Sequence, residues 1–266
     1  MKKISLFFLL FAGAFLASCH KDDDYDYEKP NPPQEEVTEL KAAGDSAAII
    51  GTINQFRNIL GDSLNVVPNK TSGRREVNWD GVPSNLTNNN LFPLDFFNLT
   101  DPAGANGRKR GLVYLQSSSP LRLDSSSFVD LEPTYATQFA PFSQRKAIIS
   151  ANSNVSEIVF KVPGTNTEAS VKGFGIVFSD VDDANSTKLE FYAGNKSLGV
   201  FKAPVRQGNG SFSFLGAFFP NEKVTRIKIT AGNGVLATGT KDVSNGGIKD
   251  LVVYDDFFYD EPKQLQ

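Results

Sequence analysis

The 266-residue sequence contains only one cysteine, one histidine, one methionine and one tryptophan. A Cys/His zinc site, an iron–sulfur cluster, a haem clamp or a disulfide framework needs more Cys and His than that. The 27 Lys and Arg residues do not outnumber the 30 Asp and Glu residues. The excess of positive charge that is typical of nucleic-acid binding is therefore missing. We expect no nucleic-acid partner and no required cofactor.

Motifs for nucleophilic and nucleotide chemistry are missing as well. The sequence has no Gly-x-Ser-x-Gly elbow, no P-loop and no dinucleotide-binding fingerprint. Its only histidine, His20, comes directly after the only cysteine, Cys19, near the start of the chain. A histidine-assisted triad in the body of the protein is excluded, because no histidine is left to act as its base. Whether the chain is an enzyme stays open, and these absences favour a protein that is not one.

The first 19 residues have the pattern of an export signal. Two lysines follow Met1, and residues 4–16 form an apolar run shorter than the roughly 20 residues that span a bilayer. The run ends in Leu-Ala-Ser-Cys at residues 16–19, which resembles the lipobox of bacterial lipoproteins. The resemblance implies that residues 1–18 are a cleaved signal peptide and that Cys19 carries the lipid that anchors the protein to the membrane. The alternative is an ordinary secretory signal with a chance cysteine after it.

A charged stretch begins directly after Cys19. Residues 20–36 contain two lysines, seven acidic residues and three prolines, whereas residues 37–266 contain 23 basic and 23 acidic residues. The stretch His-Lys-Asp-Asp-Asp at residues 20–24 is similar to the surface-export signal of Bacteroidetes lipoproteins, although a solvated spacer would have the same composition. We expect residues 19–42 to be an extended tether on an outer-membrane protein exposed at the cell surface.

The rest of the sequence predicts one mainly β domain over residues 43–264. Apolar residues at Ile49, Ile53, Phe56 and Leu60 predict a helix over residues 46–60, whereas residues 62–110 are rich in Asn, Pro and Gly and predict long loops. From about residue 110, polar and apolar residues alternate between frequent turn signals, which is typical of strands. The expected strands are residues 111–116, 157–162, 171–179, 188–191, 197–202, 211–218, 226–229, 235–238 and 251–259. The pattern indicates an antiparallel, jelly-roll-like β-sandwich with one short helix near its N-terminal end.

Several strings in the body resemble, in the same order, a widespread uncharacterised family of exported bacterial proteins. They are GRREVNWDGVP at residues 73–83, DFFN at 95–98, PTY at 133–135, GFGIVFSDVD at 173–182, SFLG at 213–216 and DDFFYDEP at 255–262. The closing string is also similar to the last strand of jelly-roll domains in surface-anchored proteins. The sequence departs from the family pattern at Asp260, where glycine is usual. The resemblance implies a fold and an exported location, but no substrate.

The loops around the single tryptophan are the candidate ligand-binding region. Trp79 can stack on a sugar ring, and Arg74, Arg75, Glu76 and Asp80 lie beside it in the sequence. We therefore expect a binding module for an extracellular glycan or another cell-surface ligand. Two alternatives stay open: a structural or interaction protein of the cell envelope, and a glycan hydrolase that uses a pair of carboxylates. Salt bridges between the acidic and basic residues of this region would also explain the pattern.

A second polar cluster begins at the end of the string at residues 173–182. Asp180, Asp182, Asp183 and Asn185 offer the oxygen ligands that Ca²⁺ prefers, although their spacing is not that of an EF-hand. We therefore expect either a structural Ca²⁺ or a tight turn between two strands.

Overall fold

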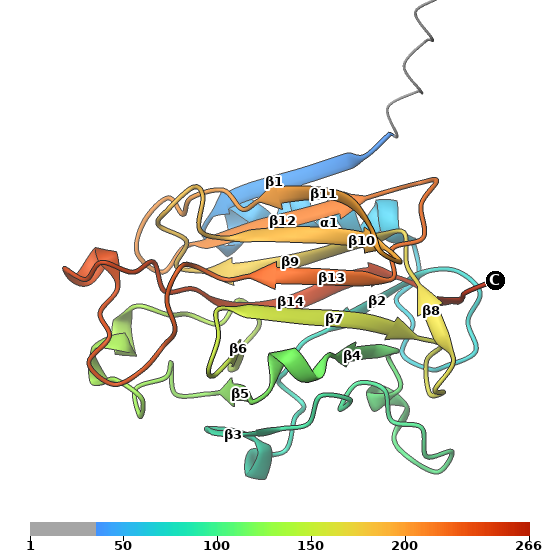
Figure 1. Ribbon diagram of the computed structural model, residues 1–266, viewed down its shortest axis with the longest axis horizontal. Coiled ribbons are helices and arrows are strands. Elements are labelled where there is room, and N and C mark those ends of the chain that lie inside the picture. The colour runs from blue at the N-terminus through green and yellow to red at the C-terminus, as the bar shows by residue number, and fades with distance from the viewer. Residues whose placement is uncertain (1–35) are drawn as a thin grey trace, which may run out of the picture. The chain divides into compact units, whose positions relative to one another are not determined.

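The computed structural model describes residues 36–266, so Cys19 and the predicted signal peptide lie outside the described part. Within these residues, two antiparallel sheets pack into a sandwich with one α-helix, as the sequence predicts (Figure 1). Within residues 36–266, no helix is long and apolar enough to cross a membrane.

The first sheet has eight strands and the second has seven. The first contains β1 (Thr38–Gly44), β12 (Phe212–Phe218), β9 (Gly173–Ser179), β14 (Val253–Asp260), β6 (Ala147–Ser150), β5 (Leu121–Asp124) and β3 (Asn89–Phe92), with β2 (Arg74–Val77) also paired to β14. The second contains β11 (Lys196–Lys202), β10 (Lys188–Ala193), β13 (Arg226–Thr230), β7 (Val155–Lys161), β8 (Glu168–Ser170) and β15 (Lys263–Gln264), with β4 (Leu112–Tyr114) also paired to β7. From β11 to β14, consecutive strands alternate between the sheets, which gives the jelly-roll-like arrangement.

The helices of residues 36–266 are few and mostly short. The α-helix is α1 (Ser46–Leu60), which matches the predicted range. The 3₁₀ helices are η1 (Ser84–Leu86), η2 (Asn106–Arg108), η3 (Gln116–Ser118), η4 (Pro133–Thr137) and η5 (Val243–Asn245). The Asp45 carboxylate caps α1 by accepting a hydrogen bond from the backbone N–H of Ala48 at 2.8 Å.

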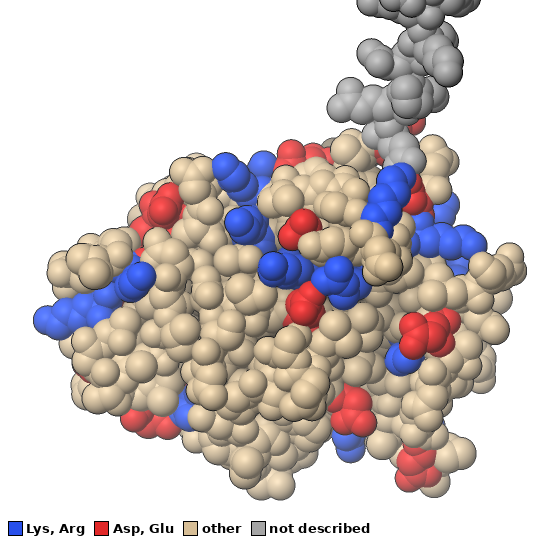
Figure 2. Space-filling view, viewed as in Figure 1, with Lys and Arg blue, Asp and Glu red and all other residues tan. Residues whose placement is uncertain are grey.

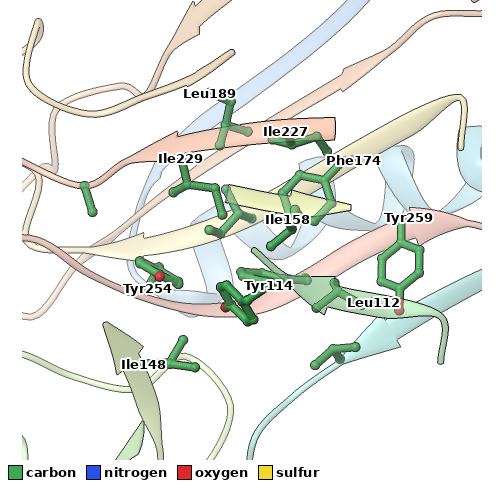
Figure 3. Packing of buried hydrophobic residues seen from close by; sticks show 14 of the residues in the cluster. Leu112, Tyr114, Ile148, Ile158, Phe174, Leu189, Ile227, Ile229, Tyr254 and Tyr259 are labelled. Carbon is green, nitrogen blue, oxygen red and sulfur yellow. The ribbon is translucent and has the colours of Figure 1, made fainter. Parts of the chain in front are cut away.

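The main core fills the space between the two sheets. Alternate residues of facing strands point into it, including Ile158, Phe174, Ile227 and Tyr259 (Figure 3). Lys and Arg are interspersed with Asp and Glu on the outer surface seen in Figure 2. This distribution agrees with the equal numbers of basic and acidic residues in residues 37–266.

The first sheet is also covered on its outer face. Helix α1 packs Phe56 and its neighbours against Phe214 and Phe258. Farther along the sheet, Phe128 and Tyr135 from the segment after β5 cover Val253. All eight residues of β14 are consequently buried, and its sequence therefore lacks the alternation of a half-exposed strand.

Several predicted boundaries differ from the structure. The sandwich begins with β1 at Thr38, inside the range predicted to be tether, because β1 pairs along its whole length with β12. The predicted loops at residues 62–110 contain the short strands β2 and β3. Residues 235–238 form no strand, because they belong to a turn-rich segment that packs Leu236 against the outer face of the first sheet.

Two glycines explain how closely α1 approaches the sheet. Gly175 on β9 is paired with Gly216 on β12, and the Phe56 ring lies over both. A Cβ atom built on Gly216 would lie 2.9 Å from the Phe56 ring, and one on Gly175 would lie 2.7 Å from it. Both distances are too short for carbon atoms, so the seating of the helix requires glycine at these positions.

We predict that Gly216→Ala lowers the free energy of unfolding by about 1–3 kcal/mol, because the added methyl group displaces Phe56. Urea unfolding of the purified domain measures the change, and adding Phe56→Leu should recover part of it. The control is Gly51→Ala on the exposed side of α1, where a Cβ has open space and the helix should gain up to about 1 kcal/mol. A Gly216→Ala protein as stable as wild type would contradict the close packing of Phe56 on this glycine.

Candidate functional site

A pocket of about 460 Å³ lies beside β2, within the size range of small-molecule binding sites. Strand β2 pairs with β14 along one edge, and its Glu76 and Val77 line the pocket together with residues from the loop after them. A second wall comes from the loop between β3 and β4. The lining residues are Leu64, Glu76, Val77, Asn78, Gly81, Val82, Pro83, Phe96, Phe97, Ala105, Gly107, Arg108 and Arg110.

Two arginines give the wall of the loop its charge. The Arg108 guanidinium lies 4.1 Å from the centre of the Phe96 ring, and its Nε donates to the Phe96 carbonyl at 3.2 Å. Arg110 donates to the carbonyl oxygens of Gly107 at 3.0 Å and Asn65 at 3.1 Å. Both side chains are thus held in place while some of their N–H groups stay unused.

Glu76 is the only carboxylate among the lining residues, and it is fully engaged by cations. Arg57 from α1 donates to both of its oxygens, at 3.0 and 2.7 Å, and Arg74 donates to one of them at 2.8 Å. The predicted salt bridge to Arg74 is therefore present. The carboxylate orients two arginines and has little capacity left to act as a general acid or base.

Trp79 is buried and does not line the pocket. Its side chain is 0% exposed and makes edge-on contacts with Phe257, Phe97 and Phe92 at centroid distances of 5.4, 5.5 and 5.8 Å. Val77 and Trp79 both belong to the main core, in keeping with the two-residue alternation of an extended chain. The prediction that Trp79 is a sugar-stacking platform is therefore wrong.

Arg75 and Asp80 also serve the fold rather than the pocket. Arg75 is 0% exposed and forms a two-point ion pair with Glu261 at 2.7 and 2.8 Å. Asp80 accepts a hydrogen bond from the backbone N–H of Arg145 and, through its carbonyl oxygen, one from Lys146. Of the five residues predicted to bind ligand, only Glu76 lines the pocket, and Arg74 acts on it indirectly.

The predicted calcium ligands are divided between two places. Asp180 and Asp182 come together with Asp242, each offering an oxygen within 4.8 Å of the others. Asp183 instead accepts from the backbone of Asn185, whose side chain accepts from Lys202. Nothing in the sequence pointed to Asp242, because it lies about sixty residues further along the chain.

A guanidinium group already contacts this carboxylate cluster. Arg206 forms ion pairs with Asp180 and with Asp182, the latter through two hydrogen bonds of 2.6 and 3.1 Å. Burial raises the pKa of Asp180 to about 7, although Arg206 acts in the opposite direction. A Ca²⁺ ion bound here would compete with Arg206 for the same oxygens.

A separate pair of buried acidic residues lies where β14 changes register. Asp255 and Asp256 occupy a bulge between Tyr254 and Phe257. Ser143 donates its hydroxyl to Asp256 at 2.5 Å, and its backbone N–H donates to Asp255 at 3.0 Å. Burial, together with the neighbouring carboxylate, raises the pKa of Asp255 well above its usual range, and burial raises that of Asp256 to about 6. Burial and the close approach of the two carboxyl groups therefore disfavour ionisation of both at once.

Comparison with known proteins found no matching family model, no similar curated protein and no similar solved structure. The function of the protein must therefore be inferred from the geometry of the site.

The buried pair Asp255 and Asp256 should make the free energy of unfolding depend on pH. Unfolded aspartate ionises near 3.8 and folded Asp256 near 6, so raising the pH through this window removes protons from the unfolded state first. The free energy of unfolding should therefore fall as the pH rises through the window. We predict that Asp256→Asn, which keeps the acceptor for Ser143, stabilises the domain by about 1–3 kcal/mol at pH 7.5.

Urea unfolding at pH 4.0 and 7.5 measures this effect. The gain from Asp256→Asn should disappear at pH 4.0, where the native carboxyl group is also protonated. The control is Asp62→Asn, which changes an exposed aspartate and should leave both values within about 0.5 kcal/mol of wild type. A variant that is less stable than wild type at pH 7.5 would show that the ionised carboxylate supports the fold.

Proposed function

We propose that the protein binds an extracellular ligand, a glycan by preference, in the pocket beside β2, and that it does so without catalysis. The observation that carries the proposal is the combination of lining groups. Leu64 and Pro83 supply exposed apolar surface, and Glu76 and Arg110 supply polar groups held in fixed positions. Sugars present apolar ring faces and hydroxyl groups together, so a mixed lining of this kind suits them.

The lining also supports binding over hydrolysis. It contains no Ser, Thr, Cys, His, Lys or Tyr, and its one carboxylate, Glu76, has both oxygens occupied by guanidinium groups. Hydrolysis by a carboxylate pair needs a second acid across the ligand. Asp80, the predicted partner, does not line the pocket and accepts a hydrogen bond from the backbone of Arg145 instead.

The proposed location of the protein comes from the N-terminal sequence. In our proposal, lipid on Cys19 anchors the chain in the outer membrane, and the acidic, proline-containing stretch after it holds the sandwich away from the cell surface. A pocket displayed in this way would meet ligands outside the cell.

We predict that the domain binds at least one polysaccharide on an array of extracellular glycans and that filling the pocket weakens this binding at least tenfold. Gly107→Trp tests the second part, because Gly107 lines the pocket and has open space where a Cβ would be added. The control is Gly51→Trp, the same substitution at an exposed position on α1. Absence of binding to every glycan, in wild type and control alike, would favour the alternative of an envelope interaction protein.

The anchor is tested separately. We predict that wild-type protein fractionates with the outer membrane and that added protease degrades it on intact cells. Cys19→Ser should release the protein into the soluble fraction, because the thiol that accepts the lipid is removed. A Cys19→Ser protein that stays with the membrane would contradict lipid anchoring, and protection of the wild type from protease would contradict surface exposure.

A further inference from the structure

The buried and half-buried arginines of the sandwich divide into two groups. Six of them form ion pairs with carboxylates: Arg57, Arg74, Arg75, Arg122, Arg206 and Arg226. Arg108 and Arg110 are different, because no carboxylate within residues 36–266 forms an ion pair with either of them. They are hydrogen-bonded to backbone carbonyl oxygens instead, and both line the pocket.

The chain keeps both guanidinium groups in place without neutralising them. Arg108 lies over the Phe96 ring, at 4.1 Å from its centre, and a hydrogen bond to the Phe96 carbonyl fixes its position. Arg110 spans from the carbonyl of Gly107 to that of Asn65. Because these contacts restrict both side chains before any ligand arrives, little conformational entropy is lost when one binds.

The pocket therefore has an excess of positive charge. Glu76 forms its ion pairs with Arg57 and Arg74, so its single negative charge offsets Arg108 and Arg110 only in part. Burial lowers the pKa of Arg110, although Tyr259 and Glu76 act in the opposite direction, so burial disfavours the charged form of its side chain. An anion that enters the pocket would favour that charged form.

We propose that the pocket selects acidic sugars, whose carboxylate or sulfate group accepts hydrogen bonds from Arg108 and Arg110 while the sugar ring contacts the apolar part of the lining. This inference rests on the proposed function and narrows its ligand class. Guanidinium groups form paired, charge-assisted hydrogen bonds with planar carboxylates and with sulfate oxygens. The apolar part of the lining, to which the exposed Leu64 and Pro83 contribute, favours a ligand with a ring face over a simple ion.

Isothermal titration of the purified domain with matched oligosaccharides tests the proposal. The probes are an oligogalacturonate, a sulfated galactan oligosaccharide and the neutral galactan oligosaccharide of the same length. We expect at least one acidic probe to bind at least tenfold more tightly than the neutral one, with the preference decreasing as salt is added. The acidic probe that binds more tightly identifies the group that the pocket recognises.

Substitutions then assign the preference to the two arginines. Arg108→Gln and Arg110→Gln should each weaken binding of the acidic probe by about 10–100-fold, because each removes charge-assisted hydrogen bonds. Binding of the neutral probe should weaken by a smaller factor, because glutamine loses the charge but still offers an N–H donor to a sugar hydroxyl. The control Arg145→Gln removes the same charge from an exposed position outside the pocket and should have no effect. Arg108→Lys, which keeps the charge, should retain part of the preference, and thermal unfolding confirms that each variant is folded.

The outcomes separate this inference from the proposed function. Equal binding of neutral and acidic probes, or an acidic preference that survives when Arg108→Gln and Arg110→Gln are combined, would overturn the inference and leave glycan binding intact. A glutamate-rich peptide is titrated as a further probe, and tighter binding of this peptide than of any sugar would overturn the inference in favour of a protein ligand. Binding of none of the probes, together with an array on which no glycan binds, would overturn both.

Discussion

The buried ion pair between Arg75 and Glu261 connects the segments on which the pocket depends. Arg75 lies on β2, and Glu261 comes directly after β14. The remaining donors of Arg75 reach the carbonyl oxygens of Val67 and Lys109, and the Glu261 carboxylate also accepts from Asn65. A buried ion pair costs desolvation that its attraction offsets only when its other hydrogen-bonding groups are satisfied. Here the partners of these groups, Asn65, Val67 and Lys109, come from the loops that lie beside the sheet.

This network explains how an irregular loop can form a defined wall. Lys109, whose carbonyl accepts from Arg75, lies between Arg108 and Arg110, the two residues that give the wall its charge. The ion pair therefore holds the segment that carries them against β2. Helix α1 supplies Arg57, which orients Glu76 on the same strand. The glycines under Phe56 let that helix approach the sheet closely, so the packing of α1 and the geometry of the pocket are linked.

The sequence predicted the sandwich and α1 because both have a periodic signal. The helix has apolar residues at helical spacing between Asp45 and Gly61, and strands such as β10 and β13 alternate because only one face is buried. Strand β14 carries no such alternation, since it is covered on both faces. The short strands β2 and β3 were missed because nearby residues are typical of turns, and because the burial of Arg75 depends on Glu261, 186 residues away in the chain.

The candidate site was only partly predictable, because the positions of its side chains also depend on residues that are distant in the chain. Glu76 was found because it stands in a run of charged residues, but that run gave no indication that Trp79 points into the core. Arg108 and Arg110 were visible as part of a basic tripeptide, Arg-Lys-Arg, within the predicted loops. We single them out because no carboxylate within residues 36–266 forms an ion pair with either arginine. This can be recognised only from the three-dimensional structure.

The distribution of charge limits how the pocket can recognise a ligand. Residues 37–266 carry as many basic as acidic residues, and the two are interspersed on the face in Figure 2, so the body has no strong overall field to attract anions from a distance. At physiological ionic strength, charges are screened beyond about 8 Å. Recognition of an acidic sugar must therefore arise from direct contact with Arg108 and Arg110, where the loop and the Phe96 ring have already fixed the donors. Selectivity should consequently appear in how slowly the ligand leaves more than in how fast it arrives.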